Sequence, residues 1–388
     1  MRAFAGGLRG LRPGVACVCL GAVLAVAARG ASPEEETAAL EKSLRMPSLG
    51  SLLWSVDATL RTGGGYHDNP RLSALNPAGS GFVSGGGELV ALRLPVDGHE
   101  ASVFVSVERR GYLARGFDPE TVVAADLRYT RLWGAGWSLG GSFEYLFLHQ
   151  VFDASELEGV PAVVLAQGHQ MTLRPVVARD IGPSWRIEAE IEASRQWLEA
   201  PLDGYSDLGP RLGGIWKLGR GQSLGVSYRF RDRFFESRHP RDDAGQELPE
   251  LLTYSQHEIE VAWRMSWGAD QRWRLVLRPG WVRNLDDGNG FYDYDRGQWV
   301  STLRYIRPRW EARLDGRARA YFYPVQTNGQ ADGAARRRTD LSLTVRGDWK
   351  PRHGVRIFAQ YEMENSDENT VASDYRANVV STGVEFEM

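Results

Sequence analysis

The feature that most constrains this chain is an alternation of charged and apolar residues that runs through Gln271–Tyr323. In the run Glu311-Ala-Arg-Leu-Asp-Gly-Arg-Ala-Arg319, odd positions are charged and even positions are apolar or small. Successive side chains of a β-strand point to opposite faces, so this pattern predicts strands with one apolar and one charged face. The charged face repeats along many long segments. An apolar outside and a charged inside is typical of a transmembrane β-barrel, in which only alternate residues meet lipid.

The same alternation divides the chain from residue 51 onward into about sixteen segments, each long enough for the ~9–11 residues of a tilted membrane strand. We place them at 51–65, 82–94, 100–112, 121–133, 136–149, 168–180, 184–197, 205–218, 221–235, 253–267, 271–284, 296–307, 309–323, 339–350, 353–364 and 373–388. Glycines and Pro210 weaken the alternation in the second and eighth segments. An even number of strands is typical of bacterial membrane barrels.

The connections between these segments alternate between two kinds. Short ones, rich in turn-forming residues, lie at 95–99, 134–136, 181–183, 219–221, 268–270, 307–309 and 351–353. Long ones lie at 66–81, 113–120, 150–167, 198–204, 236–252, 285–295, 324–338 and 365–372. Membrane barrels have short periplasmic turns and long extracellular loops. The sequence therefore predicts an all-β protein, a single antiparallel up-and-down barrel in the bacterial outer membrane, with both termini in the periplasm.

The aromatic residues supply a second, independent pattern. Tryptophans gather beside the short turns and the entry of the first strand: Trp54, Trp133, Trp137, Trp185, Trp216, Trp267, Trp273, Trp310 and Trp349. Aromatics beside the long connectors are Tyr66, Tyr112, Trp197, Tyr205, Phe235, Tyr254, Trp281, Trp299, Tyr323 and Tyr375. Aromatic rings with one polar edge collect at membrane interfaces, so we expect the two sets to form a periplasmic and an outer girdle.

The first fifty residues differ from the rest of the chain. Three arginines precede an apolar run at 14–28 that ends in small residues, which predicts a signal peptide over 1–30. Both cysteines, Cys17 and Cys19, lie inside it, so no disulfide is expected in the mature chain. Ser32-Pro33 followed by three glutamates predicts a short periplasmic helix within a lead-in over 31–50, and the barrel occupies 51–388. The alternatives are a retained membrane anchor and a docking or plugging helix.

With the apolar parity facing lipid, the charged parity lines the lumen. A charge on the lipid face costs roughly 2–4 kcal/mol at the midplane, so the charged residues must lie inside. The candidate pore-lining residues are Arg186, Glu188, Glu190, Glu192, Arg229, Arg231, Glu258, Glu260, Arg264, Arg272, Arg274, Arg278, Arg313, Asp315, Arg317, Arg319, Arg346 and Glu362. Two interpretations stay open. In the first, the acids and arginines simply pair between neighbouring strands; in the second, they create a field that selects charged solutes.

Enzymatic and metal-binding signals are weak. His67-Asp68 at the mouth of a long connector is the one pair that resembles those of outer-membrane hydrolases, but no partnered nucleophile accompanies it. The oxygen-rich connector 285–295 lacks the ligand spacing of a calcium loop, so an ordinary turn is favoured. We therefore predict no catalytic residues, no metal site and no cofactor.

One short motif resembles a known group of proteins. Gly65-Tyr-His-Asp-Asn-Pro70, at the end of the first predicted strand, is similar to the G-Y-x-D-N-P sequence of bacterial outer-membrane β-barrel porins, some of which are associated with exopolysaccharide secretion. The chain carries His67 where that group often has Asp. The terminal Gly383-Val-Glu-Phe-Glu-Met388 resembles an outer-membrane end strand, although the last residue is not aromatic.

The combined patterns predict an outer-membrane channel that passes polar or charged solute, and the resemblance implies a role in exopolysaccharide export. A general diffusion porin, and a closed barrel that serves as surface receptor or structural anchor, are the alternatives. Expected partners are outer-membrane lipid and lipopolysaccharide, with a polysaccharide and periplasmic export components implied by the resemblance. Removing residues 1–30 leaves 42 basic against 49 acidic residues, which does not suggest nucleic-acid binding.

Overall fold

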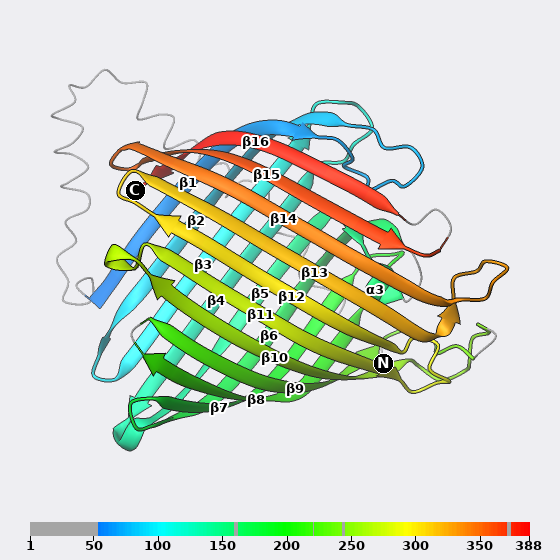
Figure 1. The fold of residues 1–388 in the computed structure, drawn as a ribbon, viewed down its shortest axis with the longest axis horizontal. Coiled ribbons are helices and arrows are strands. Elements are labelled where there is room, and N and C mark those ends of the chain that lie inside the picture. The colour runs from blue at the N-terminus through cyan, green and yellow to red at the C-terminus, as the bar shows by residue number, and fades with distance from the viewer. Residues whose placement is uncertain (1–52, 159–161, 220, 243–244, 371–373) are drawn as a thin grey trace, which may run out of the picture. The chain divides into compact units, whose positions relative to one another are not determined.

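A computed structural model describes residues 53–158, 162–219, 221–242, 245–370 and 374–388 (Figure 1). The predicted signal peptide and lead-in helix lie outside these residues. The strands are β1 (Trp54–His67), β2 (Ser80–Val96), β3 (His99–Tyr112), β4 (Glu120–Trp133), β5 (Trp137–Asp153), β6 (Val163–Ile181), β7 (Trp185–Leu198), β8 (Tyr205–Gly219), β9 (Gln222–Phe235), β10 (Thr253–Trp267), β11 (Trp273–Asp286), β12 (Tyr294–Ile306), β13 (Trp310–Thr327), β14 (Ala335–Arg352), β15 (Val355–Glu368) and β16 (Tyr375–Glu387).

Each strand pairs antiparallel with its neighbours in sequence, and β1 pairs with β16, so the sixteen strands close into one barrel. The predicted all-β antiparallel barrel is confirmed. Closure leaves no free strand edge, and the backbone groups pair within the sheet, as a β-structure that crosses a bilayer requires, with short breaks beside Pro175, Pro210 and Pro279. Within the part of the chain that the structure describes, the connections contain two short 3-10 turns, η2 (Gly134–Gly136) and η3 (Ala269–Gln271), and one short helix, α3 (Ser155–Glu158). Among the described residues no helix is long and apolar enough to cross a membrane.

Several strands extend further into the long connectors than the alternation predicted. β5 and β6 stay paired as far as Asp153 and Val163, and β13 continues to Thr327. Backbone hydrogen bonds between antiparallel neighbours do not require an apolar face, so pairing continues where the alternation fades. The barrel therefore rises beyond its apolar band at the end that carries the long loops.

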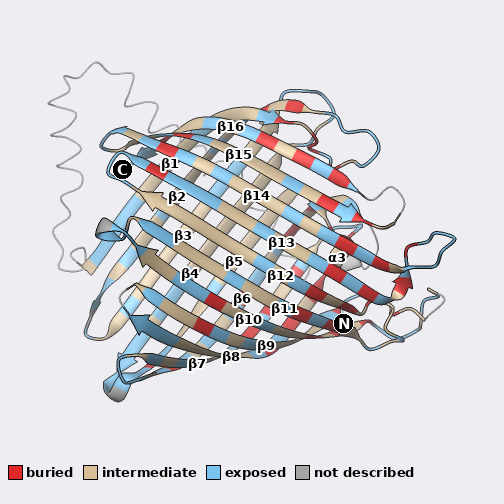
Figure 2. Cartoon of the chain, in the orientation of Figure 1, coloured by how far each residue is buried: buried red, intermediate tan, exposed pale blue. Residues whose placement is uncertain are grey.

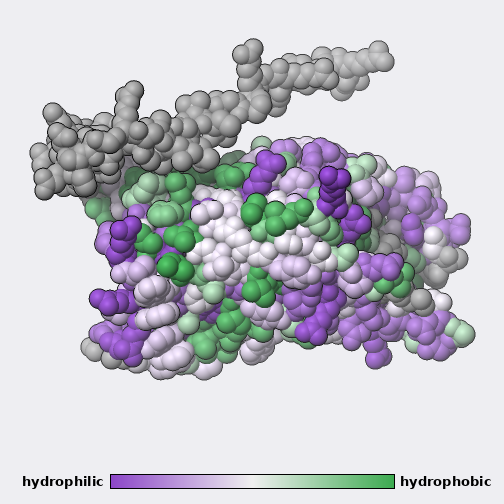
Figure 3. Space-filling model, turned by 90° about the horizontal axis from the view of Figure 1, so that it is seen from above, coloured by the Kyte–Doolittle hydropathy of each residue, from purple (hydrophilic) through white to green (hydrophobic). Residues whose placement is uncertain are grey.

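The outer surface is apolar between the two ends of the barrel. Side chains such as Ile187, Ile191 and Leu212 are more than half exposed, and they alternate with charged inward positions. Figure 3 shows hydrophobic side chains among the strands, with hydrophilic ones gathered most densely toward the long-loop end. All nine tryptophans predicted for the short-turn girdle are exposed on this surface. Three pairs of their rings stack: Trp185 with Trp216, Trp267 with Trp273, and Trp310 with Trp349.

The predicted outer girdle is only partly right. Tyr66, Trp197, Trp281 and Trp299 are exposed, as a girdle requires. Five others are buried: Tyr205, Phe235, Tyr254, Tyr323 and Tyr375. They lie on the inward parity of their strands, a fact that proximity to a long connector could not reveal. Three of these rings pack beside arginines: Arg233 lies over Tyr205 at 4.0 Å, Arg238 over Phe235 and Arg336 over Tyr323. Buried positions gather at the long-loop end (Figure 2), so this end is the best-packed part of the barrel.

Candidate functional site: the inner wall and the segment that crosses it

The inner wall is formed by the charged parity of the strands. The structure places all but one of the predicted wall residues on inward positions, on β7, β9, β10, β11, β13, β14 and β15. The exception is Arg272, which lies on the short turn just before β11 and pairs with Asp270 at 3.1 Å. The alternation had extended that strand two residues too far, so Arg272 was assigned to the wall.

On β5–β9, together with Glu258 of β10, the inward charges interlock, and we call this surface the paired wall. Glu192 on β7 is its centre, with the whole residue only 5% exposed. Its carboxylate accepts a hydrogen bond from Arg174 Nε at 2.7 Å and lies 4.0 Å from Arg229 and 3.8 Å from Arg231. Arg231 also lies 3.4 Å from Asp207 on β8. Acids and bases on six successive strands therefore neutralise one another.

A second interlocked group spans the seam where β1 meets β16. Glu385 on β16 lies 3.2 Å from Arg61 on β1 and 2.7 Å from Arg346 on β14. Arg61 also reaches Glu88 at 2.6 Å and Glu108 at 3.7 Å. The seam is the one place where the two ends of the chain must find each other, and these ion pairs connect its two sides.

Residues 153–156, at the end of β5 and the start of the connection to β6, reach across the lumen, and we call them the bridge. Asp153 accepts a hydrogen bond from Arg338 Nη2 on β14 at 2.7 Å. Glu156 lies 2.5 Å from Arg296 on β12 and accepts a hydrogen bond from the Tyr321 hydroxyl on β13 at 2.6 Å. In the ring of sixteen strands, β13 is eight positions from β5 in either direction. The bridge therefore joins opposite walls.

Sequence reasoning placed this connection among the long outside loops and missed its inward course. The contacts that hold it join residues more than a hundred positions apart, so no local pattern could reveal them. Burial by itself raises the pKa of the Glu156 carboxyl, but Arg296, the Tyr321 hydroxyl and Arg319 together hold this pKa at about 2. The bridge is thus held by an ionised carboxylate over the whole physiological range.

The hexapeptide Gly65–Pro70 fastens a second loop beside the bridge. Asp68 accepts hydrogen bonds from the backbone N–H and the side-chain amide of Asn378 on β16, both at 2.6 Å. The Asn69 amide donates to the carbonyls of Ser73 and Arg376, both at 3.0 Å. The loop then turns inward.

The inward turn of this loop buries Leu72, which has a φ of 50° and packs with Tyr375, Ala377 and Val151. Val151 precedes the bridge, so the first and third long loops meet inside the barrel. The His67 ring nitrogen pairs with the Tyr112 hydroxyl at 3.0 Å, whereas Asp68 turns to Asn378. His67 and Asp68 therefore have separate partners and do not form a catalytic pair.

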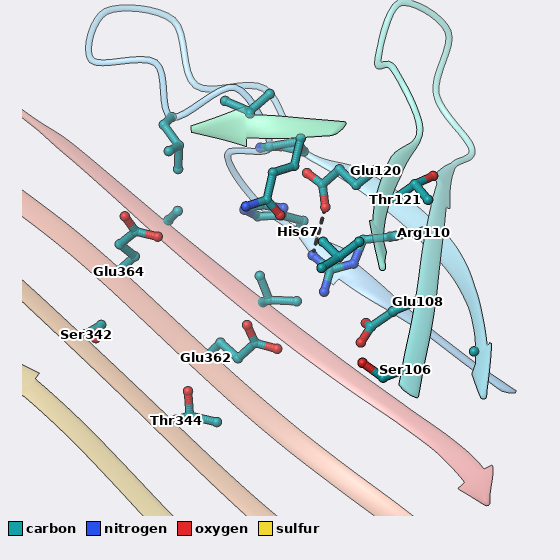
Figure 4. Close-up of a pocket in the computed structure, with 18 of the residues that line it drawn as sticks. His67, Ser106, Glu108, Arg110, Glu120, Thr121, Ser342, Thr344, Glu362 and Glu364 are labelled. Carbon is teal, nitrogen blue, oxygen red and sulfur yellow. Dashed lines mark ion pairs between the residues drawn. The ribbon is translucent and has the colours of Figure 1, made fainter. Parts of the chain in front are cut away.

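Two cavities occupy the lumen beside this inward structure. Cavity A measures about 440 Å³ and cavity B about 480 Å³, and both touch Leu72, Val151 and Glu364. Acids dominate cavity A, where Glu362 and Glu364 face Glu108 and Glu120 across the space (Figure 4). Cavity B has a mixed lining that includes Arg233, Arg317, Arg319, Arg338, Asp153, Glu156 and Asp340. The arrangement offers charged and polar surface to a solute about the size of a sugar or an amino acid.

The oxygen-rich connector 285–295 is a tight turn organised by one carboxylate. Asp286 accepts backbone hydrogen bonds from Gly288 at 3.0 Å, Gly290 at 2.9 Å and Tyr292 at 2.6 Å. Its oxygens are therefore occupied by the loop's own N–H groups. Across the described ranges no group of three or more His, Cys, Asp or Glu side chains is placed to hold a metal ion.

No family model matches the chain, and no curated protein matches it by sequence. Solved structures resemble it in fold at low identity. The outer membrane channel DcaP of Acinetobacter baumannii is 11% identical over 86% of this chain and 97% of its own, with a TM-score of 0.49. OprD from Pseudomonas aeruginosa is 9% identical over 86% and 94%, with a TM-score of 0.45. CdiB from Acinetobacter baumannii is 11% identical over 86% and 60%, with a TM-score of 0.46, so the chain spans 60% of CdiB.

Proposed function

We propose that this barrel is an outer-membrane channel for polar and charged solutes, narrowed by the bridge. The observation that carries the proposal is the bridge itself, a short segment that is held across the lumen and lines cavity B. A barrel of sixteen strands encloses enough room for an aqueous passage. The charged inner wall would keep that passage wet, and the bridge would set its width.

The proposal also covers orientation in the membrane. We propose that the long loops face outward and that the short turns and both termini lie in the periplasm, as is usual for such barrels. Lipopolysaccharide and outer-membrane lipid would then surround the apolar belt. An epitope inserted in the loop around Gly333 should be labelled on intact cells. Labelling only after the cells are broken would show that the long loops face the periplasm.

Conductance in planar lipid bilayers tests the channel. The wild-type protein should conduct, and Glu156→Gln should raise the single-channel conductance because it weakens the contacts with Arg296 and Arg319. Glu250→Gln removes an exposed acid from another long loop and serves as the control. Equal conductance in all three proteins would show that the bridge does not set the passage. No conductance from well-folded protein would instead favour a closed barrel acting as a receptor or anchor.

Polysaccharide export is a more specific proposal for the same channel. It is supported by the hexapeptide, whose His67 and Pro70 border cavity A at the long-loop end. An extended polymer would need the bridge to leave its partners on β12–β14. A deletion strain should therefore secrete less of one surface polysaccharide, and protein with the bridge tethered to β14 should not restore it. Normal secretion of every surface polysaccharide would exclude export and leave the channel proposal intact.

A further inference from the structure

One cross-strand row of the inner wall consists of arginines. The strand register places Arg274 on β11 opposite Arg304 on β12, Arg304 opposite Arg313 on β13, and Arg313 opposite Arg346 on β14. We call these four residues the arginine row. Directly opposed side chains have their Cβ atoms roughly 4.5–5.5 Å apart, and like charges in that arrangement repel each other. Four adjacent arginines therefore need acidic partners or bound anions to offset their positive charge.

Acids balance three members of the arginine row. Arg304 lies 2.5 Å from Glu311, and Arg313 lies 2.6 Å from Asp315. Arg346 lies 2.7 Å from Asp348 and the same distance from Glu385. The side chains of Arg304 and Arg313 still expose 41% and 54% of their surface, so part of each guanidinium faces the open lumen. Arg274 makes no ion pair or hydrogen bond with any described residue.

Two further arginines extend this basic surface toward the bridge. Arg278 on β11 and Arg317 on β13 both lie opposite Val300 on β12. Within the described ranges neither makes an ion pair or a hydrogen bond. Two inward acids lie beside them: Asp315 on β13, which pairs with Arg313, and Glu260 on β10, opposite Gly280, which makes no ion pair with any described residue. Beyond Arg317 on the same strand, Arg319 lies 3.9 Å from Glu156 of the bridge.

We infer that the arginine row, with Arg278 and Arg317, is a binding track for solutes that carry two or more oxyanion groups. Guanidinium groups bind carboxylate and phosphate oxygens in a bidentate manner, and several at strand spacing can hold several anionic groups at once. The track leads from the short-turn end to the bridge. This inference rests on the proposed channel for access of solute, and it names the solute class: multivalent carboxylates or phosphates.

Citrate is the probe for this site, because it carries three carboxylates in a small molecule. We would measure its binding to the purified full-length protein in detergent by isothermal titration at low ionic strength. The test variant is the double substitution Arg274→Gln and Arg317→Gln, which removes two arginines without leaving an acid unpaired. The control is Arg186→Gln and Arg211→Gln, which removes the same charge from β7 and β8.

The test variant should weaken citrate binding about tenfold, since a charge-assisted hydrogen bond lost in a wet lumen contributes only part of its buried strength. The control should change it less than about twofold, and added salt should weaken wild-type binding. Equal affinity in both double variants, or no citrate binding by the wild type, would overturn the inference.

Conductance measured without citrate separates this inference from the channel proposal. If the protein conducts and the two double variants bind citrate equally, the channel stands and the track is refuted. If it does not conduct but loses citrate binding only in the test variant, the track stands and the channel is refuted.

Discussion

Two parts of the inner wall, the paired wall and the wall of β11–β13, share one sequence pattern but differ in how far their charges are paired. On the paired wall, Glu192 alone lies within 4.0 Å of three arginines. On the wall of β11–β13, Arg274, Arg278 and Arg317 have no acidic partner among the described residues. Both parts show the same alternation of charged and apolar positions. The strand register, which decides which side chains become neighbours, separates a braced wall from one whose charge stays available to solute.

The largest difference between the two walls should appear in stability. Replacing Glu192 with alanine leaves Arg174, Arg229 and Arg231 without their shared carboxylate. We expect the free energy of unfolding to fall by roughly 3 kcal/mol, as when one partner of a buried ion pair is removed. Urea unfolding in lipid vesicles, followed by tryptophan fluorescence, measures it. Glu260→Ala removes an unpaired inward acid and should change stability by less than about 0.5 kcal/mol. An equal loss of unfolding free energy in Glu192→Ala and Glu260→Ala would show that ion pairing does not stabilise the paired wall.

The bridge should respond to pH only under strongly acidic conditions. The Glu156 pKa is lowered from 4.5 to about 2, so the charged contact is fully present above the ordinary value and is lost as pH falls through about 2. Bridge-dependent conductance should therefore stay constant from pH 7 to about pH 4. In Arg296→Met, the pH at which the bridge is released and the conductance rises should move up toward the ordinary pKa of a carboxyl group. A rise in wild-type conductance near pH 4.5 would show that these contacts do not hold Glu156.

Charge reversal should affect ion selectivity on one wall more than on the other. Arg278→Glu places an acid among unpaired arginines, and we expect the permeability ratio of chloride to potassium to fall several-fold because a free wall charge acts directly on passing ions. Arg211→Glu on the paired wall should shift the ratio less. Reversal potentials in a KCl gradient measure both. A larger shift from Arg211→Glu would show that the paired wall, and not the wall of β11–β13, determines ion selectivity.

The seam between β1 and β16 should show a smaller effect. Asp68→Ala removes two hydrogen bonds to Asn378, and we expect a loss of about 1–2 kcal/mol in the free energy of unfolding. Asp367→Ala, an exposed acid on β15, is the control and should be nearly neutral. The midpoint of heat-dependent gel mobility would rank the two variants. If Asp68→Ala matches the control, the hexapeptide does not stabilise the seam.

The smallest effect is expected on the arginine wall itself. Arg317→Gln removes a charge that has no acidic partner among the described residues and that lies near other arginines, so stability should change by less than about 0.5 kcal/mol or rise slightly. The same urea titration used for Glu192→Ala detects this. A loss as large as 2 kcal/mol would show that Arg317 braces the wall.

The parts of this molecule that the sequence predicts are those set by local patterns. Strand number, the alternation of short and long connections, and the tryptophans beside the short turns each depend on neighbouring residues. The buried tyrosines were misplaced because distance along the chain from a loop does not fix parity, as Tyr254 and Tyr323 illustrate. Arg272 was misplaced because the strand boundary was set two residues too early.

The bridge and the two kinds of wall lie beyond local patterns. Glu156 gives no sign in sequence of its contacts on β12 and β13, and nothing near Arg174 predicts its place beside Glu192. Arg304 was not among the candidate residues, although it completes the arginine row. The two walls follow from which strands become neighbours, and the bridge follows from how a loop reaches the opposite strands. Both arrangements exist only once the barrel has closed.

The length of chain between the bridge and its partners on β12 and β13 also bears on the order of folding. Glu156 and Tyr321 are 165 residues apart, so the β5–β6 hairpin can form long before its partners on β12 and β13 are in place. Contacts of such long range are slow to form because the intervening chain must first be ordered. We therefore expect the lumen to narrow only after β12 and β13 have paired, and the seam between β1 and β16, which joins residues more than 300 positions apart, to close later still.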